Sequence, residues 1–395
     1  MPSVLALALL LGGLASVGPL SMDMYLPGLP QLSDDLGAST SAAQLTLTAC
    51  LAGLALGQLL AGPLSDRLGR RRPVLVGSTL FTAASLACAF APGVEGLITL
   101  RFVQGLGGAA GIVVGRAVVR DLYEGDAAAR LFSSLMLVGG IAPIAAPVIG
   151  WALLAVTDWR GVFTVLSVIA AVLLLAAARS LPESLAQPTG RRGGTARVLR
   201  DRRFVGYALC TGLMMGAMFA YIAGSPFVLQ DIYGLSPQAY SLVFAMNGLG
   251  IVVASSFSRR LIGRATPLQL LNAGVALGAA GALLLLAAVL IEAPIGVVLV
   301  ALTLVVSSIG LVNPNATALA LADHPADAAA ASALLGTAQF LLGAAAAPLV
   351  GLAGSGTALP MALTITGAVA LATLAGRRHR PGPLTDAPMA WSSRA

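Results

Sequence analysis

Long, nearly uninterrupted apolar segments recur along the whole chain and constrain its fold more than any other feature. Two clear examples are residues 4–22 and 162–178, and short clusters of Arg, Asp, Gly and Pro separate such segments. About 20 apolar residues in a helix cross the roughly 30 Å hydrocarbon core of a bilayer. Backbone amides in lipid must find partners within their own helix or in a closed barrel, and the strand-like alternation of a barrel is absent. The sequence therefore predicts an all-α polytopic membrane protein.

The apolar segments predict twelve transmembrane helices, arranged as two six-helix bundles. Hydrophobic residues make up 57% of the 395 residues and charged residues only 10%, so water is not the solvent for most of the surface. Two repeated bundles of this kind are typical of transporters. We expect an N-terminal bundle at 1–181, a cytoplasmic linker at 182–203, a C-terminal bundle at 204–376 and a cytoplasmic tail at 377–395. The expected spans are 3–28, 41–62, 73–91, 97–117, 130–152, 160–180, 204–226, 238–257, 267–288, 293–316, 329–351 and 358–376.

The positive charge predicts the orientation of these spans. It is carried entirely by Arg, which clusters beside the apolar segments. If the N-terminus is cytoplasmic, every Arg except Arg101 and Arg160 lies inside or at the inner boundary, as the positive-inside rule requires. We therefore expect both termini in the cytoplasm. The net charge of +7 is then explained by the orientation of the chain in the membrane and not by a nucleic-acid partner.

Neither the cysteines nor the titratable residues suggest a cofactor. Cys50, Cys88 and Cys210 all sit in apolar stretches, where a cysteine behaves as a small hydrophobic residue. The sequence contains no metal-ligand cluster, no nucleotide-binding loop and no nucleophile paired with a base. It therefore predicts no cofactor, no metal and no enzymatic activity.

Asp23 is an acidic residue well inside an expected span. It shares a small or polar helical face with Gly12, Ser16, Pro19 and Pro27, so its carboxyl should point into the bundle and away from lipid. Burial favours the neutral carboxyl, which makes proton uptake and release feasible near neutral pH. In a purely structural alternative, Asp23 is neutral and bonded to a backbone group at the Pro-broken helix end.

The loop after the second expected span has the most specific sequence. Residues 62–73 read Gly-Pro-Leu-Ser-Asp-Arg-Leu-Gly-Arg-Arg-Arg-Pro and resemble the signature loop of the major facilitator superfamily. Gly62 and Gly69 allow a close approach and a tight turn, and Asp66 can accept bonds from a helix N-terminus or from an Arg of a neighbouring helix. Such contacts would stabilise one conformational state. The alternative, a basic loop that follows the positive-inside rule, does not require Gly and Asp at these positions. The conformational candidates here are Gly62, Asp66, Arg67, Gly69, Arg70 and Arg71.

Arg101 begins a second stretch that resembles this superfamily. Residues 101–108 read Arg-Phe-Val-Gln-Gly-Leu-Gly-Gly, similar to the family's Arg motif of the fourth span. Glycines spaced three or four residues apart share one helical face with Arg101, and such a face lets another helix approach closely. An Arg in the membrane is costly, so we expect it to face protein or an aqueous cavity and to have a partner. Snorkelling to the outer boundary is the alternative, because Arg101 lies near the start of its span.

The fifth expected span contains two prolines about one turn apart. Residues 142–151 read Ala-Pro-Ile-Ala-Ala-Pro-Val-Ile-Gly-Trp and resemble the antiporter motif of drug exporters in the superfamily. Pro143 and Pro147 favour a kinked helix packed closely on a neighbour, and Gly150 belongs to the same candidate motif. Alanine stands at two positions where glycine is usual, and Trp151 replaces the final glycine. Ordinary small-residue packing explains the stretch about equally well.

Further segments at 21–27, 118–121 and 159–163 make the resemblance more specific. Together with the motifs above, they resemble the bicyclomycin and chloramphenicol resistance (Bcr/CflA) subfamily of drug–proton antiporters. The resemblance implies a major facilitator fold and export of amphipathic antibiotics across the bacterial cytoplasmic membrane in exchange for protons, with Asp23 as the proton carrier. We expect Arg101 to tune Asp23 or bind substrate, and the Arg116 region to stabilise one state. The expected partners are a small-molecule drug, protons and the lipid bilayer, with the chain acting as a monomer.

Several polar or polarizable side chains are weaker candidates for a substrate cavity. Thioethers beside aromatic rings form adaptable apolar walls, and amides either line a cavity or bond helices together. For any single Met, packing against lipid or between helices is the more common role. The cavity candidates are Tyr25, Gln104, Met218, Tyr221, Asn247 and Gln339.

Two other functions are open at this point. A proton-coupled importer of a small metabolite fits the same fold, although polar cavities for sugar-like solutes usually need more carboxylates and amides. A non-transporting membrane sensor belongs to a different class, and we expect no appended soluble domain to support it. Accumulation of candidate compounds in cells would separate import from export.

Overall fold

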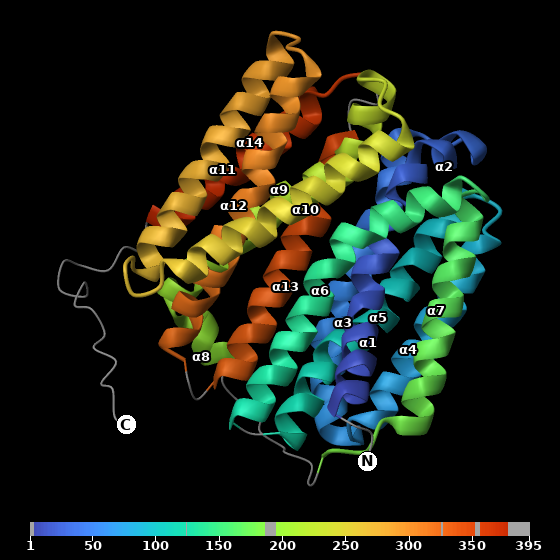
Figure 1. Ribbon diagram of the computed structural model, residues 1–395, viewed down its shortest axis with the longest axis vertical. Coiled ribbons are helices and arrows are strands. Elements are labelled where there is room, and N and C mark those ends of the chain that lie inside the picture. The colour runs from blue at the N-terminus through green and yellow to red at the C-terminus, as the bar shows by residue number, and fades with distance from the viewer. Residues whose placement is uncertain (1–3, 124, 186–194, 325–326, 352–355, 378–395) are drawn as a thin grey trace.

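The chain folds almost entirely into helices in a computed structural model (Figure 1). The structure describes residues 4–123, 125–185, 195–324, 327–351 and 356–377, and within these ranges it describes the side chains except at 4–5, 120, 125–130, 132–140, 195, 328–329 and 377. The long helices are α1 (Val4–Asp23), α3 (Thr40–Leu68), α4 (Arg71–Ala89), α5 (Val94–Leu122), α6 (Gly125–Leu154), α7 (Trp159–Ser180), α9 (Arg202–Pro226), α10 (Pro237–Arg260), α11 (Pro267–Leu290), α12 (Ile295–Ala322), α13 (Ala328–Ala346) and α14 (Leu359–Arg377). The short segments are η1 (Leu26–Gly28), α2 (Leu29–Asp35), α8 (Thr195–Arg200), η2 (Phe227–Ile232) and η4 (Ala347–Gly351).

Most of the long helices can cross a membrane. In the described part of the chain, eleven helices are long and apolar enough to do so. The twelfth, α6, has 30 residues, and its stretch Ile141–Leu154 is also apolar. A helix satisfies its own backbone hydrogen bonds, which is why these apolar segments can lie in lipid. The predicted all-α polytopic membrane fold is therefore confirmed.

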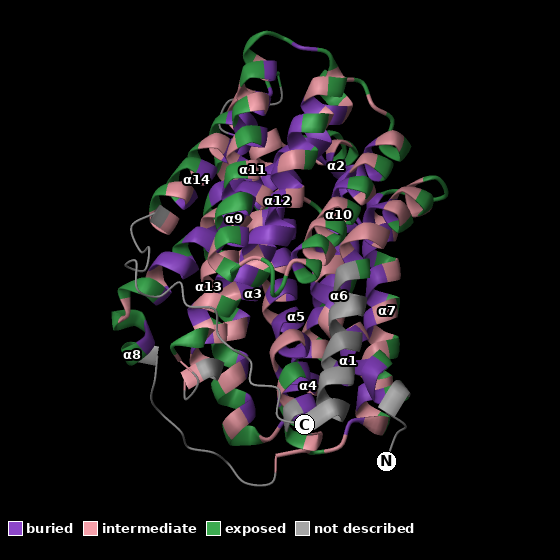
Figure 2. Cartoon of the chain, turned by 60° about the vertical axis from the view of Figure 1, so that its left-hand side comes forward, coloured by how far each residue is buried: buried purple, intermediate pink, exposed green. Residues whose placement is uncertain are grey.

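The long helices pack in two groups of six. Helices α1 and α3 to α7 contact one another and form the first bundle, and α9 to α14 form the second bundle in the same way. The two bundles lie side by side in Figure 1. Between them, α3 packs on α13, and α6 packs on α10. Buried residues gather where helices face one another, and exposed residues lie mainly on the outer faces (Figure 2).

Glycines let α3 and α5 approach closely inside the first bundle. A Cβ atom at Gly53 would overlap the carbonyl of Phe102, and a Cβ atom at Gly105 would overlap the carbonyl of Cys50. Contacts between small residues hold helices together in membranes, because lipid removes the hydrophobic force that joins helices in water. This packing positions Arg101, on α5, beside α1, α3 and α4.

The bundles are joined at one end of the molecule. We call the end that carries α2, η2 and η4 the α2 end, and the opposite end, where α3 ends just after Asp66, the Asp66 end. At the α2 end, the Ser41 hydroxyl donates to the Gly351 carbonyl (2.6 Å), and the Gln44 amide donates to the Ala223 carbonyl (3.1 Å). Among the described residues, these are the hydrogen bonds that join the two bundles directly.

Several helix boundaries differ from the predicted ones; α3, for example, continues to Leu68, beyond its predicted end at residue 62. The first span is predicted to reach residue 28, but α1 ends at Asp23 and the chain then turns through η1. Pro27 and Gly28 lie in η1, where the missing N–H of proline and the freedom of glycine disfavour a continued α-helix. The expected linker contains the six-residue helix α8, and α9 begins at Arg202. The expected tail lies outside the described residues from 378 onward.

Candidate functional site

Arg101 is fully buried in the first bundle. Its Nη1 donates to the carbonyl oxygen of Ser21 (2.9 Å) and to Oε1 of Gln104 (2.5 Å). Its guanidinium carbon lies 4.6 Å from the centre of the Tyr25 ring and 5.5 Å from the centre of the Phe163 ring, which is cation–π geometry. Its Nε and Nη2 are buried without an acceptor among the described residues. The structure thus places Arg101 inside protein.

Asp23, the last residue of α1, lies in the same region. Only 5% of the residue is exposed, and its carboxyl is close enough to Arg101 for the two groups to interact electrostatically. Tyr221 and Tyr240 of the second bundle also lie within electrostatic range of this carboxyl. The structure therefore brings the two residues predicted for proton coupling together, opposite the second bundle.

Tyr25 and Gln104 hold Arg101 in place. The Tyr25 hydroxyl shares a hydrogen bond with Oγ1 of Thr46 on α3 (3.0 Å), while its ring lies against the guanidinium. Gln104 accepts from Arg101 and donates from Nε2 to the hydroxyl of Ser85 on α4 (2.7 Å). Both residues are cavity candidates from the sequence, and both are buried against protein. They orient Arg101 in this structure.

A chain of polar contacts crosses the second bundle. Asn247 of α10 donates to the Tyr221 hydroxyl on α9 (2.9 Å) and accepts from the Thr303 hydroxyl on α12 (2.8 Å). The hydroxyls of Ser225 and Tyr240 lie 3.2 Å apart beside this chain. Asn247 thus bonds three helices together, which is one of the two roles that the sequence allows for a buried amide.

The other two cavity candidates lie apart from the Asp23 region. Met218 of α9 is half-buried and packs against the apolar core. Gln339 of α13 is also half-buried, and its side chain forms no hydrogen bond with another described residue. The structure does not bring either residue into contact with Asp23 or Arg101.

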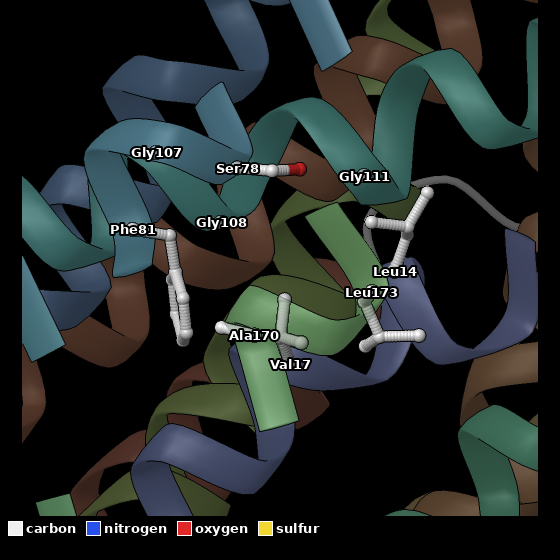
Figure 3. A pocket seen from close by; sticks show the side chains of 9 residues that line it. All are labelled: Leu14, Val17, Ser78, Phe81, Gly107, Gly108, Gly111, Ala170 and Leu173. Atoms are coloured by element: carbon white, nitrogen blue, oxygen red, sulfur yellow. The ribbon is translucent and has the colours of Figure 1, made fainter. Parts of the chain in front are cut away.

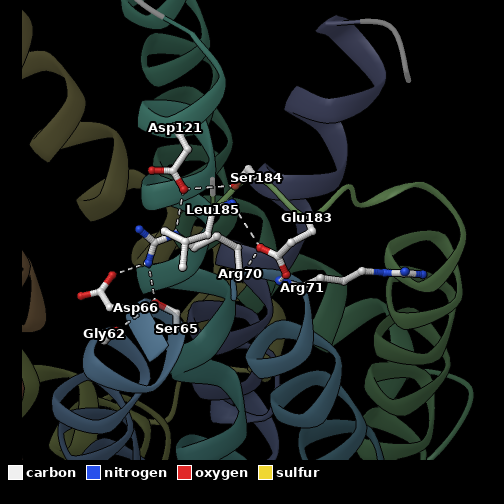
Figure 4. A network of polar contacts seen from close by, with 9 residues as sticks. All are labelled: Gly62, Ser65, Asp66, Arg70, Arg71, Asp121, Glu183, Ser184 and Leu185. Atoms are coloured by element: carbon white, nitrogen blue, oxygen red, sulfur yellow. Dashed lines mark hydrogen bonds and ion pairs between the residues drawn. The ribbon is translucent and has the colours of Figure 1, made fainter. Parts of the chain in front are cut away.

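A second polar group lies at the Asp66 end (Figure 4). Arg70 donates from Nη1 to Oδ1 of Asp66 (2.5 Å) and to the hydroxyl of Ser65 (2.8 Å), and from Nε to Oδ2 of Asp121 (2.8 Å). Asp66 lies in the last turn of α3 and bonds to the side chain of Arg70, the residue directly before α4. The neighbouring helix α5 contributes a second acid, which is Asp121.

Glu183 fastens the start of the linker to this group. Its carboxylate accepts the backbone N–H groups of Arg70 (2.7 Å) and Arg71 (3.2 Å), and the next residue, Ser184, donates to Asp121 (3.1 Å). Partial burial disfavours the charged carboxylate, but the surrounding backbone N–H groups outweigh this and lower the pKa of Glu183 below its usual 4.5. The linker thus contacts both α4 and α5.

The remaining candidates at this end lie at a turn or on the surface. Gly69 ends α3 with a φ of +86°, which side chains disfavour, so a glycine suits this turn. Arg67, Arg71 and Arg116 are exposed, and Arg71 donates to a carbonyl at the end of α7 (2.5 Å). Gly62 is half-buried on α3.

The proline motif packs α6 against its neighbours. Pro143 and Pro147 lie within α6, which continues through both. A Cβ atom at Gly150 would overlap the carbonyl of Met24, so α6 approaches the chain directly after α1. Ile144 of the same helix lies against α10 of the second bundle. The motif therefore contacts both bundles.

A small cavity lies in the first bundle between α1, α4, α5 and α7 (Figure 3). Its volume is about that of one water molecule, so a drug does not fit in it. It is lined by Leu14, Val17, Ser78, Phe81, Gly107, Gly108, Gly111, Ala170 and Leu173.

Comparison with known proteins decides the family. The profile of the Major Facilitator Superfamily matches residues 11–348, which is most of the chain. The chain belongs to the major facilitator superfamily. Its proteins are secondary transporters, so this major facilitator protein is a transporter and not an enzyme, as predicted.

Relatives of this major facilitator protein include proteins named for drug resistance. It is 42% identical over 368 residues to an uncharacterized MFS-type transporter YdgK of Bacillus subtilis. The aligned region covers 90% of this chain and 91% of the relative. It is 30% identical to a bicyclomycin resistance protein homolog of Haemophilus influenzae, over 93% and 94% of the two chains. It is 33% identical to a chloramphenicol resistance protein of Pseudomonas aeruginosa, over 72% and 68%. The predicted resemblance to the bicyclomycin and chloramphenicol resistance subfamily is confirmed.

Solved structures of other major facilitator proteins share the fold. A bacterial homolog of the human lysosomal transporter Spinster, in an inward-facing and occupied conformation, matches with a TM-score of 0.75 and 13% identity, over 95% of each chain. The xylose transporter XylE of E. coli, in a partially occluded inward-open conformation, matches with a TM-score of 0.74 and 16% identity, over 96% and 98% of the two chains. At these identities the likeness shows the fold alone.

Residues outside the predicted candidates complete the two polar groups of this major facilitator protein, and four of them bond directly to candidates. Thr46 bonds to Tyr25, Ser85 bonds to Gln104, Asp121 bonds to Arg70, and Glu183 binds the start of α4. Hydroxyls in apolar helices are too common to single out from the sequence. An acid directly after Pro182, at the start of an Arg-rich linker, is the local signal that points to Glu183.

Proposed function

We propose that this protein exports amphipathic antibiotics, such as chloramphenicol or bicyclomycin, across the bacterial cytoplasmic membrane in exchange for protons. The relatives with resistance names support this substrate class, and they cover most of the chain. The superfamily fold supports transport by alternating access, in which two bundles rock about a site near the middle of the membrane.

The observation that carries the proposal is the burial of Asp23 together with Arg101. Charged groups inside a membrane protein are costly, and they persist where they move ions or protons. The Arg101 charge favours the ionised carboxyl and burial favours the neutral one, so one carboxyl has two accessible states. We propose that Asp23 gains a proton on one side of the membrane and loses it on the other.

Proton and drug are coupled because each weakens the binding of the other. In our proposal, the drug binds when Asp23 is ionised, and proton uptake from outside promotes drug release. The protonated protein then returns inward and loses its proton to the cytoplasm. Thermodynamic reciprocity requires that bound drug lower the proton affinity of the protein by the same factor by which a bound proton lowers its drug affinity.

The bonding pattern supports an assignment of the two ends. The Asp66 end carries exposed arginines such as Arg67 and Arg71, so by the positive-inside rule we place it, and both termini, in the cytoplasm. The bundles are joined by Ser41 and Gln44 at the α2 end, and we propose that this arrangement is an inward-facing state. We propose that the Arg70 group stabilises one of the two states. One chain contains both bundles, so we propose that it works as a monomer.

The test is chloramphenicol transport into inverted vesicles from an exporter-deficient bacterium. An acidic vesicle interior should drive accumulation by the wild-type protein, and dissipation of the pH gradient should abolish it. The substitution Asp23→Asn should reduce the pH-driven rate at least about tenfold, because the side chain no longer titrates. The matched control is Asp34→Asn, at an exposed acid of α2. Gradient-driven transport that is equal in Asp23→Asn and wild type would refute the proton role.

A further inference from the structure

The turn between α10 and α11 carries three arginines without an acidic partner. Arg259 and Arg260 end α10, Arg264 lies in the turn, and all three are exposed. Residues 232–291 contain no Asp and no Glu. Among the described residues, none of the three arginines forms an ion pair, and Arg259 donates to the hydroxyl of Ser256 (3.2 Å). Their charge is therefore not neutralised by the described protein.

The corresponding loop of the first bundle is different. There Arg70 pairs with Asp66 and Asp121, and Arg71 donates to a carbonyl at the end of α7. Both loops lie at the Asp66 end, because α10 begins after η2 at the α2 end and runs the length of the bundle. The positive-inside rule accounts for arginines in both loops, but not for the acids that accompany them only in the first.

The turn holds its arginines in a fixed arrangement. The N–H of Arg264 donates to the carbonyl of Leu261 (2.9 Å), and Gly263 adopts a φ of +89°, which suits glycine. The end of α10 is fixed on α12, since the amide of Asn315 donates to the hydroxyl of Ser258 (2.9 Å). The three guanidinium groups therefore extend from one short, hydrogen-bonded segment, where several of them can gather around one anion.

An exposed apolar face of α10 leads directly to these charges. Met246, Val253 and Phe257 are all exposed, the last of them by 57%, and they recur at the spacing of one helical side. Arg260 follows Phe257 by three residues and so continues the same side. Because α10 is apolar and long enough to cross a membrane, this face lies against lipid chains and Arg260 lies near the headgroups.

This combination of groups fits one kind of ligand. A guanidinium group binds phosphate oxygens through paired N–H donors, and it keeps its charge at any physiological pH. A free phosphate would use the arginines but leave the apolar face beside them without a partner. A phospholipid with a net negative headgroup brings a phosphate and two acyl chains to the same place, and so it satisfies both.

We infer that the α10–α11 turn is a binding site for an anionic phospholipid. The phosphate lies among Arg259, Arg260 and Arg264, and the acyl chains lie along the exposed face of α10 that includes Phe257. Ile262, at the tip of the turn, is 73% exposed and lies between the arginines in the sequence, which makes it a suitable position for a reporter. The site is independent of the compound that the protein exports.

The test uses a tryptophan reporter and brominated lipids, which quench an indole only when they lie beside it. The full-length Ile262→Trp variant is reconstituted into bilayers that mix phosphatidylglycerol with phosphatidylcholine, with either lipid brominated in turn. The signal of the three native tryptophans is subtracted with the wild-type protein. We expect at least about a tenfold preference for phosphatidylglycerol at the turn, since each arginine near a membrane surface favours anionic lipid about fivefold.

The substitutions Arg259→Gln, Arg260→Gln and Arg264→Gln, combined with the reporter, should reduce this preference to less than about twofold. Arg197→Gln is the control, because Arg197 is an exposed arginine of the linker helix α8 that pairs with Asp327. It should leave the preference at the turn unchanged. Thermal unfolding of each variant shows whether the fold is intact.

A second reporter separates this site from the general charge of the cytoplasmic face. Leu68→Trp lies at the end of α3, where Leu68 is 52% exposed beside the arginines of the first bundle. Because acids accompany those arginines, we expect a preference of less than about threefold there.

The outcomes decide the proposal. A preference confined to the α10–α11 turn and abolished by the three substitutions supports it. Equal preference at the two reporters overturns it, since the membrane then responds only to the overall charge of the protein. An unchanged preference in the triple variant also overturns it. Displacement of brominated phosphatidylglycerol by inorganic phosphate at constant ionic strength would mean that the turn binds a free anion and not a lipid.

Discussion

The carboxylate of Glu183 accepts the backbone N–H of Arg70 at 2.7 Å and that of Arg71 at 3.2 Å. These N–H groups belong to the start of α4, where a helix has donors without partners of its own. A carboxylate at this position satisfies them and also interacts favourably with the helix dipole. The first residues of the linker are thereby bound to the first bundle, next to the Arg70 group (Figure 4).

Glu183→Gln should destabilise the first bundle slightly. The amide still accepts a hydrogen bond but carries no charge, and we expect a loss of about 0.5–1 kcal/mol in the free energy of unfolding. Thermal unfolding of the detergent-purified protein should show a decrease of about 1–2 °C. Glu292→Gln, at an exposed loop acid, is the control. Equal melting temperatures for Glu183→Gln and wild type would show that the contact contributes nothing.

The Glu183 contact should also depend on pH. Because the pKa of Glu183 in the folded protein lies below its usual 4.5, its stabilising contribution is complete above about pH 4.5. It is lost as the pH falls from there through the lower folded pKa. The difference in melting temperature between wild type and Glu183→Gln should therefore be constant near neutral pH and shrink toward zero in acid. A difference that grows in acid would mean that the folded pKa is raised.

Arg101→Lys should impair transport although the charge is conserved. An ammonium group cannot reproduce the planar contacts with Ser21, Gln104 and the Tyr25 ring at once. We expect the pH-driven rate of chloramphenicol transport to fall at least about tenfold when equal amounts of protein are compared. The loss of one positioned hydrogen-bond donor from an enzyme active site has an effect of at least this size.

Arg160→Lys provides a control with similar chemistry. Arg160 also lies over an aromatic ring, that of Trp159, and pairs with Asp35, but it is partly exposed. Its replacement should change the rate less than about twofold, since surface ion pairs contribute little. Equal losses in both variants would mean that any altered Arg damages the fold.

Gly150→Ala should destabilise the protein, although alanine is the better helix former. The new methyl group would overlap the carbonyl of Met24, and overpacking of this kind costs about 1–3 kcal/mol. Gly367→Ala on α14 meets nothing within 4 Å and should be neutral or stabilising by up to about 1 kcal/mol. Gly150→Ala should therefore lower the melting temperature, whereas Gly367→Ala should leave it unchanged or raise it. A stabilised Gly150→Ala would show that α6 and Met24 lie further apart.

The sequence predicts the helices well because each span must be apolar over about 20 residues. It overextends the first span, since the apolar run continues past Asp23 while Pro27 and Gly28 end the helix. Hydropathy measures the solvent around a segment and says little about its backbone. The local rules for proline and glycine carry that information instead.

The chemistry of the buried site is only partly visible in the sequence. Asp23 and Arg101 are conspicuous because each is a charge in an apolar run, and the structure places them together. Their partners are ordinary polar residues from other helices, such as Ser85 and Thr46, and no spacing in the sequence reveals which helices meet.

The two bonds that join the bundles at the α2 end both use main-chain carbonyls as acceptors. Every residue type provides such a carbonyl, so a substitution at Ala223 leaves that acceptor in place, but a Cβ atom at Gly351 would overlap the side chains of Ser41 and Gln44. The side-chain contribution is encoded only by Ser41 and Gln44, both on α3. The contact between the bundles therefore depends on both halves of the chain, since the absence of a side chain at Gly351 leaves the space that Ser41 and Gln44 occupy.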